Sequence, residues 1–280
     1  MKPPAFDYHR PGSVEEATEL LGRLGADAKV LAGGQSLMPM LNLRLAAPRH
    51  LVDINRVAGL GGVEVSERAV TVGALARQHD VAASPEVAAR CPLLPEAIAH
   101  VGHRAIRNRG TVAGSVVHGD PAAELPAALV LLDGSVEAVG PAGTRTIAAA
   151  DLYAGWFETT LRPDELVRSV TFQAPGPGEG SAFLEFSRRR GDFALCAVAA
   201  RVAPPAVRVV VAGVQPTPAA LDATGALGPD GGAALDELAS ALEPEDDIHA
   251  SAGFRRHLAR VLMERAIARA AARAGEAGDG

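Results

Sequence analysis

The sequence is poor in cysteine and in aromatic residues, and it has no long apolar run. Its two cysteines, Cys91 and Cys196, are far apart, so they provide neither a disulfide framework nor the four thiolates that an iron–sulfur cluster requires. We expect both to be small buried apolar residues. A single tryptophan, two tyrosines and a formal charge of -6 argue against a nucleic-acid partner, which needs a basic face and stacking platforms.

Membrane and metal signals are missing as well. No apolar run approaches the roughly 20 residues of a membrane-spanning helix, and the first residues, MKPPAFDYHRPGS, lack the apolar core of a secretion signal. The sequence therefore predicts no membrane span and a cytoplasmic location. His100 and His103 are one helical turn apart, but no cysteine or carboxylate set completes a ligand shell beside them. We predict no metal site.

Glycine and proline, by contrast, are plentiful and divide the chain into short elements. The densest cluster is APGPGEG, residues 174–180, which is the best candidate for a domain boundary. Ser13 and Glu16 form a capping box before an amphipathic helix. Apolar patterns predict strands at residues 28–31, 50–54, 135–140, 165–174, 193–202 and 206–214, a hairpin at 62–75, and helices at 92–102, 124–134, 233–242 and 255–274. This mixture predicts an α+β protein, and residues 152–163 stay unassigned.

Two glycine segments are the most informative features. The first, Gly33 to Ser36, follows the apolar run KVL, and the second spans Gly110 to Ser115. In each, we expect a loop whose backbone N–H groups bind a phosphate, with Gly110, Thr111, Gly114 and Ser115 as donors in the second. Together they suit a pyrophosphate. Neither a P-loop nor a G-x-G-x-x-G motif between strand and helix is present. The alternative is a pair of ordinary glycine turns.

A hydrolytic triad is the other chemistry that this region suggests. Ser115, His118 and Asp120 are the residue types required, but all three fall within six residues, and the local G-x-S-x-G elbow is absent. We therefore predict no catalytic residue in this chain.

Four longer stretches resemble a known family. They are AGGQSLMPMLNLRLAAPRHLVDI, GHRAIRNRGTVAGSVVHGDPAAELPA, TTLRPDEL and RRRGDFALCAVAA. In this order, over about residues 4–215, the chain resembles the FAD-binding medium subunit of the molybdenum hydroxylases, the xanthine dehydrogenase family, of the carbon monoxide dehydrogenase type. The resemblance implies a vanillyl-alcohol-oxidase-like (PCMH-type) FAD-binding domain at 1–175, built of two α/β subdomains (about 1–55 and 56–175). A C-terminal α+β domain at 176–280, with a small antiparallel sheet and helices, would follow.

The resemblance also implies which residues contact FAD. The two glycine segments would hold the pyrophosphate and ribityl chain, while three polar residues would lie beside the ribityl chain and flavin. Ala113 replaces a glycine that is usual in the family, so its φ must be negative or strained. Phe193 replaces a frequent tyrosine near the isoalloxazine and lacks its hydroxyl. The implied FAD-binding residues are Ala32, Gly33, Gly34, Gln35, Ser36, Leu37, Thr111, Ala113, Gly114, Ser115, His118, Asp120, Glu124, Leu161 and Phe193.

The function implied is that of an FAD subunit in a larger oxidoreductase. Electrons would pass from [2Fe–2S] clusters on a small partner subunit, through FAD, to an external acceptor. A large partner subunit would carry the molybdopterin cofactor, and the family commonly assembles as a dimer of heterotrimers. Two alternatives stay open: a flavin-free binding or assembly module with the same fold, and a stand-alone flavin oxidoreductase. The sequence discloses neither the substrate, among carbon monoxide, aldehydes, purines and other N-heterocycles, nor the electron acceptor.

Overall fold

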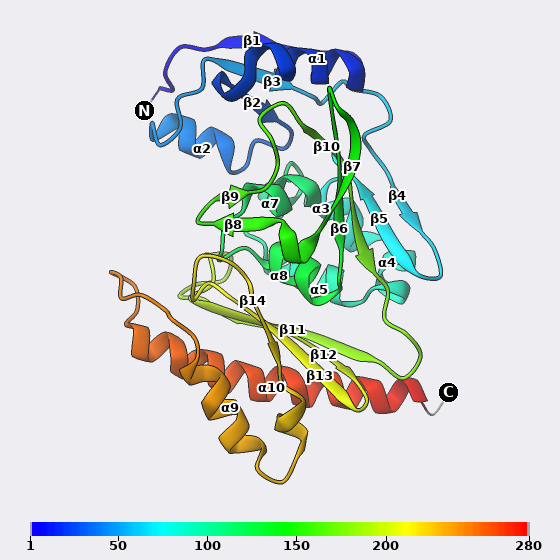
Figure 1. Ribbon diagram of the computed structural model, residues 1–280, viewed down its shortest axis with the longest axis vertical. Coiled ribbons are helices and arrows are strands. Elements are labelled where there is room, and N and C mark those ends of the chain that lie inside the picture. The colour runs from blue at the N-terminus through cyan, green and yellow to red at the C-terminus, as the bar shows by residue number, and fades with distance from the viewer. Residues whose placement is uncertain (1, 279–280) are drawn as a thin grey trace.

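The computed structural model describes residues 2–278, and three sheets with their helices follow one another along the long axis of the molecule (Figure 1). The first is a parallel sheet in the order β1-β3-β2. The helix α1 begins after Ser13, whose side chain accepts from the Glu16 amide at 3.1 Å, and the Glu16 carboxylate accepts from the Gly12 amide at 2.7 Å. The bounds are β1 Asp7–His9, α1 Val14–Leu24, a 3-10 turn Gly25–Asp27, β2 Ala28–Leu31, α2 Leu37–Asn42 and β3 His50–Asp53.

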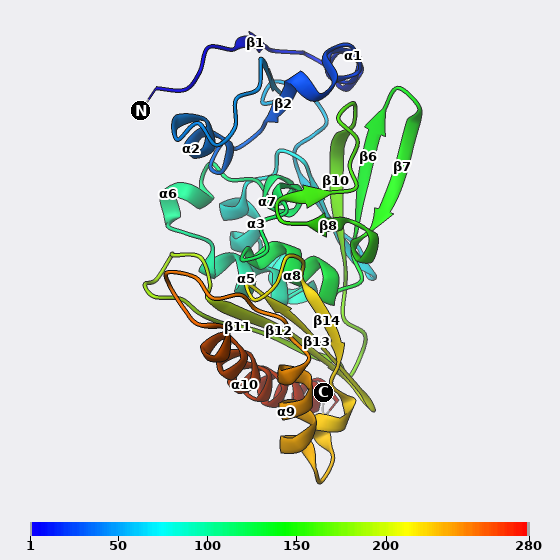
Figure 2. The same cartoon turned by 60° about the vertical axis from the view of Figure 1, so that its left-hand side comes forward.

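The second sheet is antiparallel and has the order β4-β5-β10-β6-β7. A bundle of short helices covers it, and a two-stranded sheet lies beside them (Figures 1 and 2). The segment left unassigned in sequence supplies that small sheet, β8 and β9. The bounds are β4 Val63–Val65, β5 Ala69–Gly73, α3 Gln78–Ala83, α4 Pro85–Arg90, α5 Leu93–His100, α6 Arg104–Arg107, α7 Val112–His118, α8 Glu124–Leu131, β6 Ser135–Gly140, β7 Gly143–Ala148, a 3-10 turn Ala149–Asp151, β8 Tyr153–Gly155, β9 Glu158–Thr159 and β10 Leu166–Gln173.

The third sheet is a four-stranded antiparallel meander, with the long helix α10 across its outer face (Figure 2). At the start of its first strand, Gly180 lies so close to α10 that an added Cβ would be 2.0 Å from the carbonyl oxygen of Ala270. Only glycine permits that contact. The bounds are β11 Gly180–Phe186, β12 Cys196–Ala203, β13 Ala206–Ala212, β14 Ala219–Asp222, a 3-10 turn Thr224–Leu227, α9 Gly231–Ser240 and α10 Ala252–Gly278.

The third sheet is buried on both faces, which explains why its strands are mostly apolar. Along β12, Ala197 and Ala199 belong to the core shared with the second layer, whereas Val198 and Ala200 face the core under α10. The boundary that the sequence analysis predicts after residue 175 falls between β10 and β11. The segments on its two sides are nevertheless joined by a continuous core, because one face of the third sheet packs against α5 and α8. Within residues 2–278, no helix has the length and apolarity needed to cross a bilayer.

Candidate functional site

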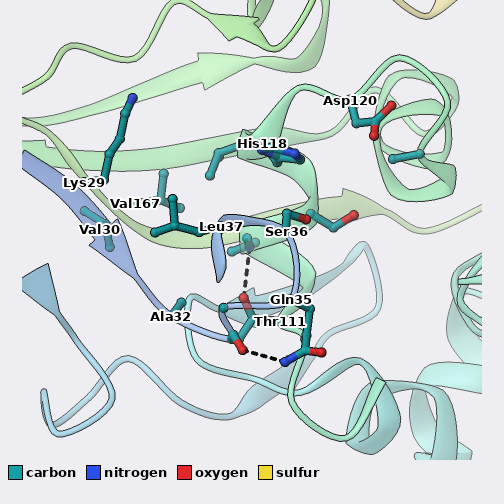
Figure 3. Close-up of a pocket in the computed structure, with 18 of the residues that line it drawn as sticks. Lys29, Val30, Ala32, Gln35, Ser36, Leu37, Thr111, His118, Asp120 and Val167 are labelled. Atoms are coloured by element: carbon teal, nitrogen blue, oxygen red, sulfur yellow. Dashed lines mark hydrogen bonds between the residues drawn. The ribbon is translucent and has the colours of Figure 1, made fainter. Parts of the chain in front are cut away.

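A cavity of about 640 Å³ lies between the first and second layers, bordered by β2, α2, α7 and the start of α8 (Figure 3). This is the volume range of small-molecule sites in proteins. The structure brings together in its wall every residue that the sequence analysis assigned to a cofactor, although these residues span positions 32 to 193. They are Ala32, Gly33, Gly34, Gln35, Ser36, Leu37, Thr111, Ala113, Gly114, Ser115, His118, Asp120, Glu124, Leu161 and Phe193.

The first glycine segment connects β2 to α2 as a tight loop, as predicted. Gly34 has φ +72°, a conformation that glycine adopts without the steric cost of a side chain. The side chain of Gln35 donates to the carbonyl oxygen of Gly33 at 3.1 Å (Figure 3). Within residues 2–278, the amide N–H groups of residues 33–37 donate no hydrogen bond. Five successive amides are therefore available to an anion in the cavity.

The second glycine segment is not the loop that we predicted, because a helix begins inside it. Thr111 is the N-cap of α7, and its hydroxyl accepts from the Gly114 amide at 3.0 Å (Figure 3). The Gly110 amide donates to Ile106 at 2.7 Å and the Ser115 amide to Thr111 at 3.2 Å. Three of the four amides that we expected to bind phosphate are thus engaged within the chain. Threonine in an extended conformation is a favoured N-cap residue. This local preference starts a helix despite the neighbouring glycines.

Ala113 has a negative φ and no backbone strain, so its methyl group is compatible with the local backbone. It lies in the first turn of α7 and is buried. The non-glycine residues with positive φ among residues 2–278 are Arg44, Asp133 and Phe157. Because an alanine is a favourable residue in a helix, the substitution suits the helical conformation of this segment.

The two segments touch through their main chains. A Cβ added to Gly33 would lie 2.4 Å from the carbonyl oxygen of Arg109 and 2.8 Å from the Cα of Gly110. Only a hydrogen atom fits between these backbones. Residues 33–36 and 110–115 therefore form one wall of the cavity, as the pyrophosphate hypothesis requires.

Acidic residues occupy the opposite end of the cavity, at the end of α7 and the start of α8. Glu124 is 4% exposed, and burial, with lesser contributions from Glu185 and Asp120, raises its pKa to about 8. Burial also raises the pKa of Asp120, whose carboxylate accepts from the Ala122 amide at 2.9 Å. Burial lowers the pKa of His118. At neutral pH, Glu124 is thus a neutral acid that can donate a hydrogen bond as well as accept one.

Known protein families include one that matches most of this chain. Residues 4–174 match the model of the FAD binding domain in molybdopterin dehydrogenase. The chain belongs to this family. It is 39% identical over 287 residues to subunit alpha of the 6-hydroxypseudooxynicotine dehydrogenase complex of Paenarthrobacter nicotinovorans, with 98% of this chain and 97% of that protein covered. It is 37% identical over 293 residues to the carbon monoxide dehydrogenase medium chain of Hydrogenophaga pseudoflava, with 98% and 99% covered.

A solved structure agrees with the sequence relationship. Carbon monoxide dehydrogenase of Hydrogenophaga pseudoflava, in a form that lacks the Mo-pyranopterin moiety, matches the fold with a TM-score of 0.91 at 36% identity, covering 98% of this chain and 99% of that one. The predicted resemblance to the FAD-binding medium subunit is confirmed, and with it the α+β fold with small antiparallel sheets. The chain is an FAD-binding oxidoreductase subunit of the molybdenum hydroxylase type.

The described residues fit the diphosphate of FAD. A diphosphate carries negative charge and many acceptor oxygens, and residues 33–37 offer five amides without partners beside the Gly33–Arg109 contact. Strand β2 adds Lys29, an exposed cation that also lines the cavity, on the side away from Gln35 and Thr111 (Figure 3). The ribityl hydroxyls would lie beside the carboxyl groups of Asp120 and Glu124. An ionised carboxylate accepts hydrogen bonds from hydroxyl groups, and a protonated one can also donate.

Leu161 and Phe193 lie at the rim of the cavity. Phe193 is 64% exposed and belongs to the connection between β11 and β12. This connection rests on the segment before α6, because an added Cβ at Gly191 would be 2.6 Å from the His103 ring. Residues of the connection between β11 and β12 therefore line the same cavity as β2. Phe193 brings an aromatic ring there and no hydrogen-bonding side-chain group.

Sequence reasoning missed several lining residues, of which two polar ones are informative. Lys29 lies within the predicted strand, where a lysine four residues before the glycines carries no distinct signal. Gln78 begins α3 and is 3% exposed. Its Nε2 donates to the Thr111 carbonyl oxygen at 3.4 Å, while its buried Oε1 has no partner. No sequence pattern marks this glutamine, because only the fold brings it beside Gly110.

The two cysteines and the histidine pair have structural surroundings in this fold. Burial raises the pKa of Cys91 to about 11 and of Cys196 to about 12, so both thiols are buried and protonated. No group of three or more histidine, cysteine, aspartate or glutamate side chains among residues 2–278 is arranged to hold a metal ion. His100 instead lies 3.2 Å from the Glu185 carboxylate.

Proposed function

We propose that this chain binds one FAD non-covalently in the described cavity and carries electrons from [2Fe–2S] clusters of a partner subunit to an external acceptor. The single observation that supports it best is the wall formed by residues 33–37 and 110–115, where five amides that donate no hydrogen bond within residues 2–278 adjoin a second backbone segment. In this arrangement, residues 32–37 bind the diphosphate, and the amide of Ala113 faces it from the first turn of α7.

The remaining residues orient the cofactor without acting as acids or bases in a reaction. Lys29 adds positive charge to the cavity on the side of His118, Asp120 and Glu124 bind hydroxyl groups, and Leu161 and Phe193 contact the ring system. When bound, FAD supplies the capacity to accept and release electrons singly or in pairs. Because Phe193 is largely exposed, one edge of the ring system stays accessible to the acceptor.

We infer that the complex includes a large molybdenum-binding subunit and a small [2Fe–2S] subunit, as a dimer of heterotrimers. The names of the relatives, a dehydrogenase complex subunit and a medium chain, support an assembly of unlike chains. The domain boundary after residue 175 and the cytoplasmic location stay predictions. Substrate oxidation belongs to the molybdenum subunit, so this chain does not select among carbon monoxide, aldehydes and N-heterocycles.

Titration of the purified full-length chain with FAD tests the proposal. We expect quenching of flavin fluorescence to saturate at one FAD per chain. Gly34→Ala should weaken FAD binding because φ +72° disfavours a side chain and because its Cβ would meet Leu31 and Met38 at 3.2 and 3.3 Å. Gly178→Ala is the matched control, since Gly178 also has φ +72° and its Cβ would meet nothing within 4 Å.

Three outcomes separate the alternatives. Protein that stays colourless after incubation with FAD would contradict the proposal and favour the flavin-free module. Bound flavin that a small substrate reduces without partner chains would favour the stand-alone oxidoreductase. Equal FAD affinity in the Gly34→Ala and Gly178→Ala variants would show that the first glycine segment does not contact the diphosphate.

A further inference from the structure

We propose that Asn55 and Arg77 form a clamp behind the cavity that holds the two phosphate-facing segments at the spacing a diphosphate requires. The inference rests on the proposed function and extends it to two residues that lie outside the cavity's lining. Asn55 follows β3, and Arg77 is the residue before α3. Each connects to a carbonyl oxygen of one segment, and the two side chains connect to each other.

The clamp is an unbroken chain of hydrogen bonds. Asn55 Nδ2 donates to the carbonyl oxygen of Ala32 at 2.8 Å. Asn55 Oδ1 accepts from Arg77 Nη2 at 2.7 Å, and Arg77 Nη1 donates to the carbonyl oxygen of Arg109 at 2.6 Å. The chain thus links the residue before Gly33 to the residue before Gly110. Planar, bidentate geometry of this kind is available to arginine and not to lysine.

The orientation of the Asn55 amide is set by Asp53. The Asp53 carboxylate accepts from the Asn55 backbone amide at 2.9 Å and from Asn55 Nδ2 at 2.6 Å. Tyr8 donates its hydroxyl to the other oxygen of the same carboxylate. With Nδ2 bound to two acceptors, Oδ1 is left to face Arg77, so the amide has one consistent assignment.

The clamp also determines which way the first segment's amides face. In a trans peptide the carbonyl and the following N–H point in opposite directions. Holding the Ala32 carbonyl on the Asn55 side therefore turns the Gly33 N–H to the opposite side. Ala32 and Gly33 line the large cavity and also a second hollow behind it, whose wall includes Asn55, Asp53 and Arg109. The segment is a thin wall, and the clamp supports it from behind.

The Arg109 carbonyl oxygen that accepts from Arg77 is also the atom that Gly33 contacts most closely. That oxygen is the atom 2.4 Å from a Cβ added to Gly33. A backbone bridge between Arg77 and Thr111 secures the arginine's own main chain. Loss of the guanidinium would release the Arg109 carbonyl and break the link to Asn55, which still holds the Ala32 carbonyl, so the two segments could separate. Supporting contacts of this kind control binding geometry without touching the ligand.

Isothermal titration of the full-length chain with ADP and AMP, together with FAD, tests the clamp. ADP carries the diphosphate that would span both segments, whereas the single phosphate of AMP meets only one. We expect Arg77→Met to weaken ADP and FAD binding about tenfold and AMP binding much less. Arg104→Met, at an exposed arginine on α6, is the matched control and should bind all three ligands as the wild type does.

Two further variants separate positioning from a general loss of structure. Arg77→Lys keeps the charge but reaches one acceptor at a time, so we expect intermediate ADP affinity. Asn55→Asp keeps the oxygen that accepts from Arg77 and removes the N–H donor to Ala32. If the Arg77→Met variant does not fold, Asn55→Asp takes its place as the principal variant. Because both residues act in one chain, Arg77→Met combined with Asn55→Asp should weaken ADP binding no more than either change alone.

The outcomes distinguish the two hypotheses. Wild-type protein that binds neither FAD nor ADP would refute the proposed function and the clamp with it. Wild-type protein that binds both, with ADP affinity in Arg77→Met and Asn55→Asp within twofold of normal, would refute the clamp alone. Equal losses of ADP and AMP affinity would also overturn it, since a spacing effect requires a ligand that meets both segments.

Discussion

Replacing Glu124 with glutamine tests whether the acidic end of the cavity is neutral when the protein is folded. Glu124 is 4% exposed at the start of α8, and burial is the main reason that its pKa rises from 4.5 to about 8. Glutamine has almost the same size and cannot ionise. The variant therefore removes the titration of this one group and leaves the packing of α8 nearly unchanged.

The magnitude follows from the linkage between proton binding and folding. Because the folded pKa is raised, the folded chain binds the proton more tightly than the unfolded chain. The associated stability is fully present below pH 4.5 and is lost as the pH rises to about 8. At 1.36 kcal/mol for each pKa unit, Glu124 accounts for a loss of about 3 kcal/mol in the free energy of unfolding between pH 5.5 and pH 8.5.

Urea denaturation of the cofactor-free chain at these two pH values is the assay. We expect the wild type to lose about 3 kcal/mol more than Glu124→Gln over this interval. The other titrating groups, His118 and Asp120 among them, are common to both proteins and cancel in the difference. Glu67→Gln, at an exposed carboxylate between β4 and β5, is the control and should follow the wild type. Identical pH dependence in Glu124→Gln and wild type would show that Glu124 is not held neutral by burial.

Three other substitutions test separate features. Gly33→Ala forces a methyl group against the Arg109 carbonyl oxygen, so we expect a loss of about 1–3 kcal/mol in the free energy of unfolding. The purified variant should contain little flavin, as measured by the ratio of flavin to protein absorbance. Phe193→Tyr should change stability by less than about 0.5 kcal/mol, since the side chain is exposed, and keep FAD content while altering the flavin absorption envelope; an unchanged spectrum would remove the ring contact. Arg145→Met breaks the bidentate pair with Glu165; because the Arg145 side chain is 35% exposed, solvent screens the pair and the loss should be about 1 kcal/mol at pH 7. Because Arg145 lowers the pKa of Glu165, the difference between variant and wild type in thermal melts should shrink as the pH falls through that pKa.

Local patterns in the sequence were sufficient for much of the fold. Ser13 and Glu16 predicted the start of α1, and alternating or continuous apolar runs predicted most strands, because these signals depend on hydrogen bonds and burial within a few residues. Short helices such as α2 and α7 were missed, since six or seven residues contain too little periodicity. The second glycine segment was interpreted as a loop because its glycines concealed the N-cap at Thr111.

The sequence by itself determined the family, the α+β composition and many of the residues that line the cavity, since glycine is required where two main chains come into contact. The tertiary structure alone decided which groups are free to act. It engaged the amides of Gly110, Gly114 and Ser115, left those of residues 33–37 without partners, and raised the pKa of Glu124 by burial. It also joined Asn55 and Arg77, which are distant in sequence from both glycine segments. Hydrogen bonding and burial depend on neighbours from other layers, and no local pattern encodes those neighbours.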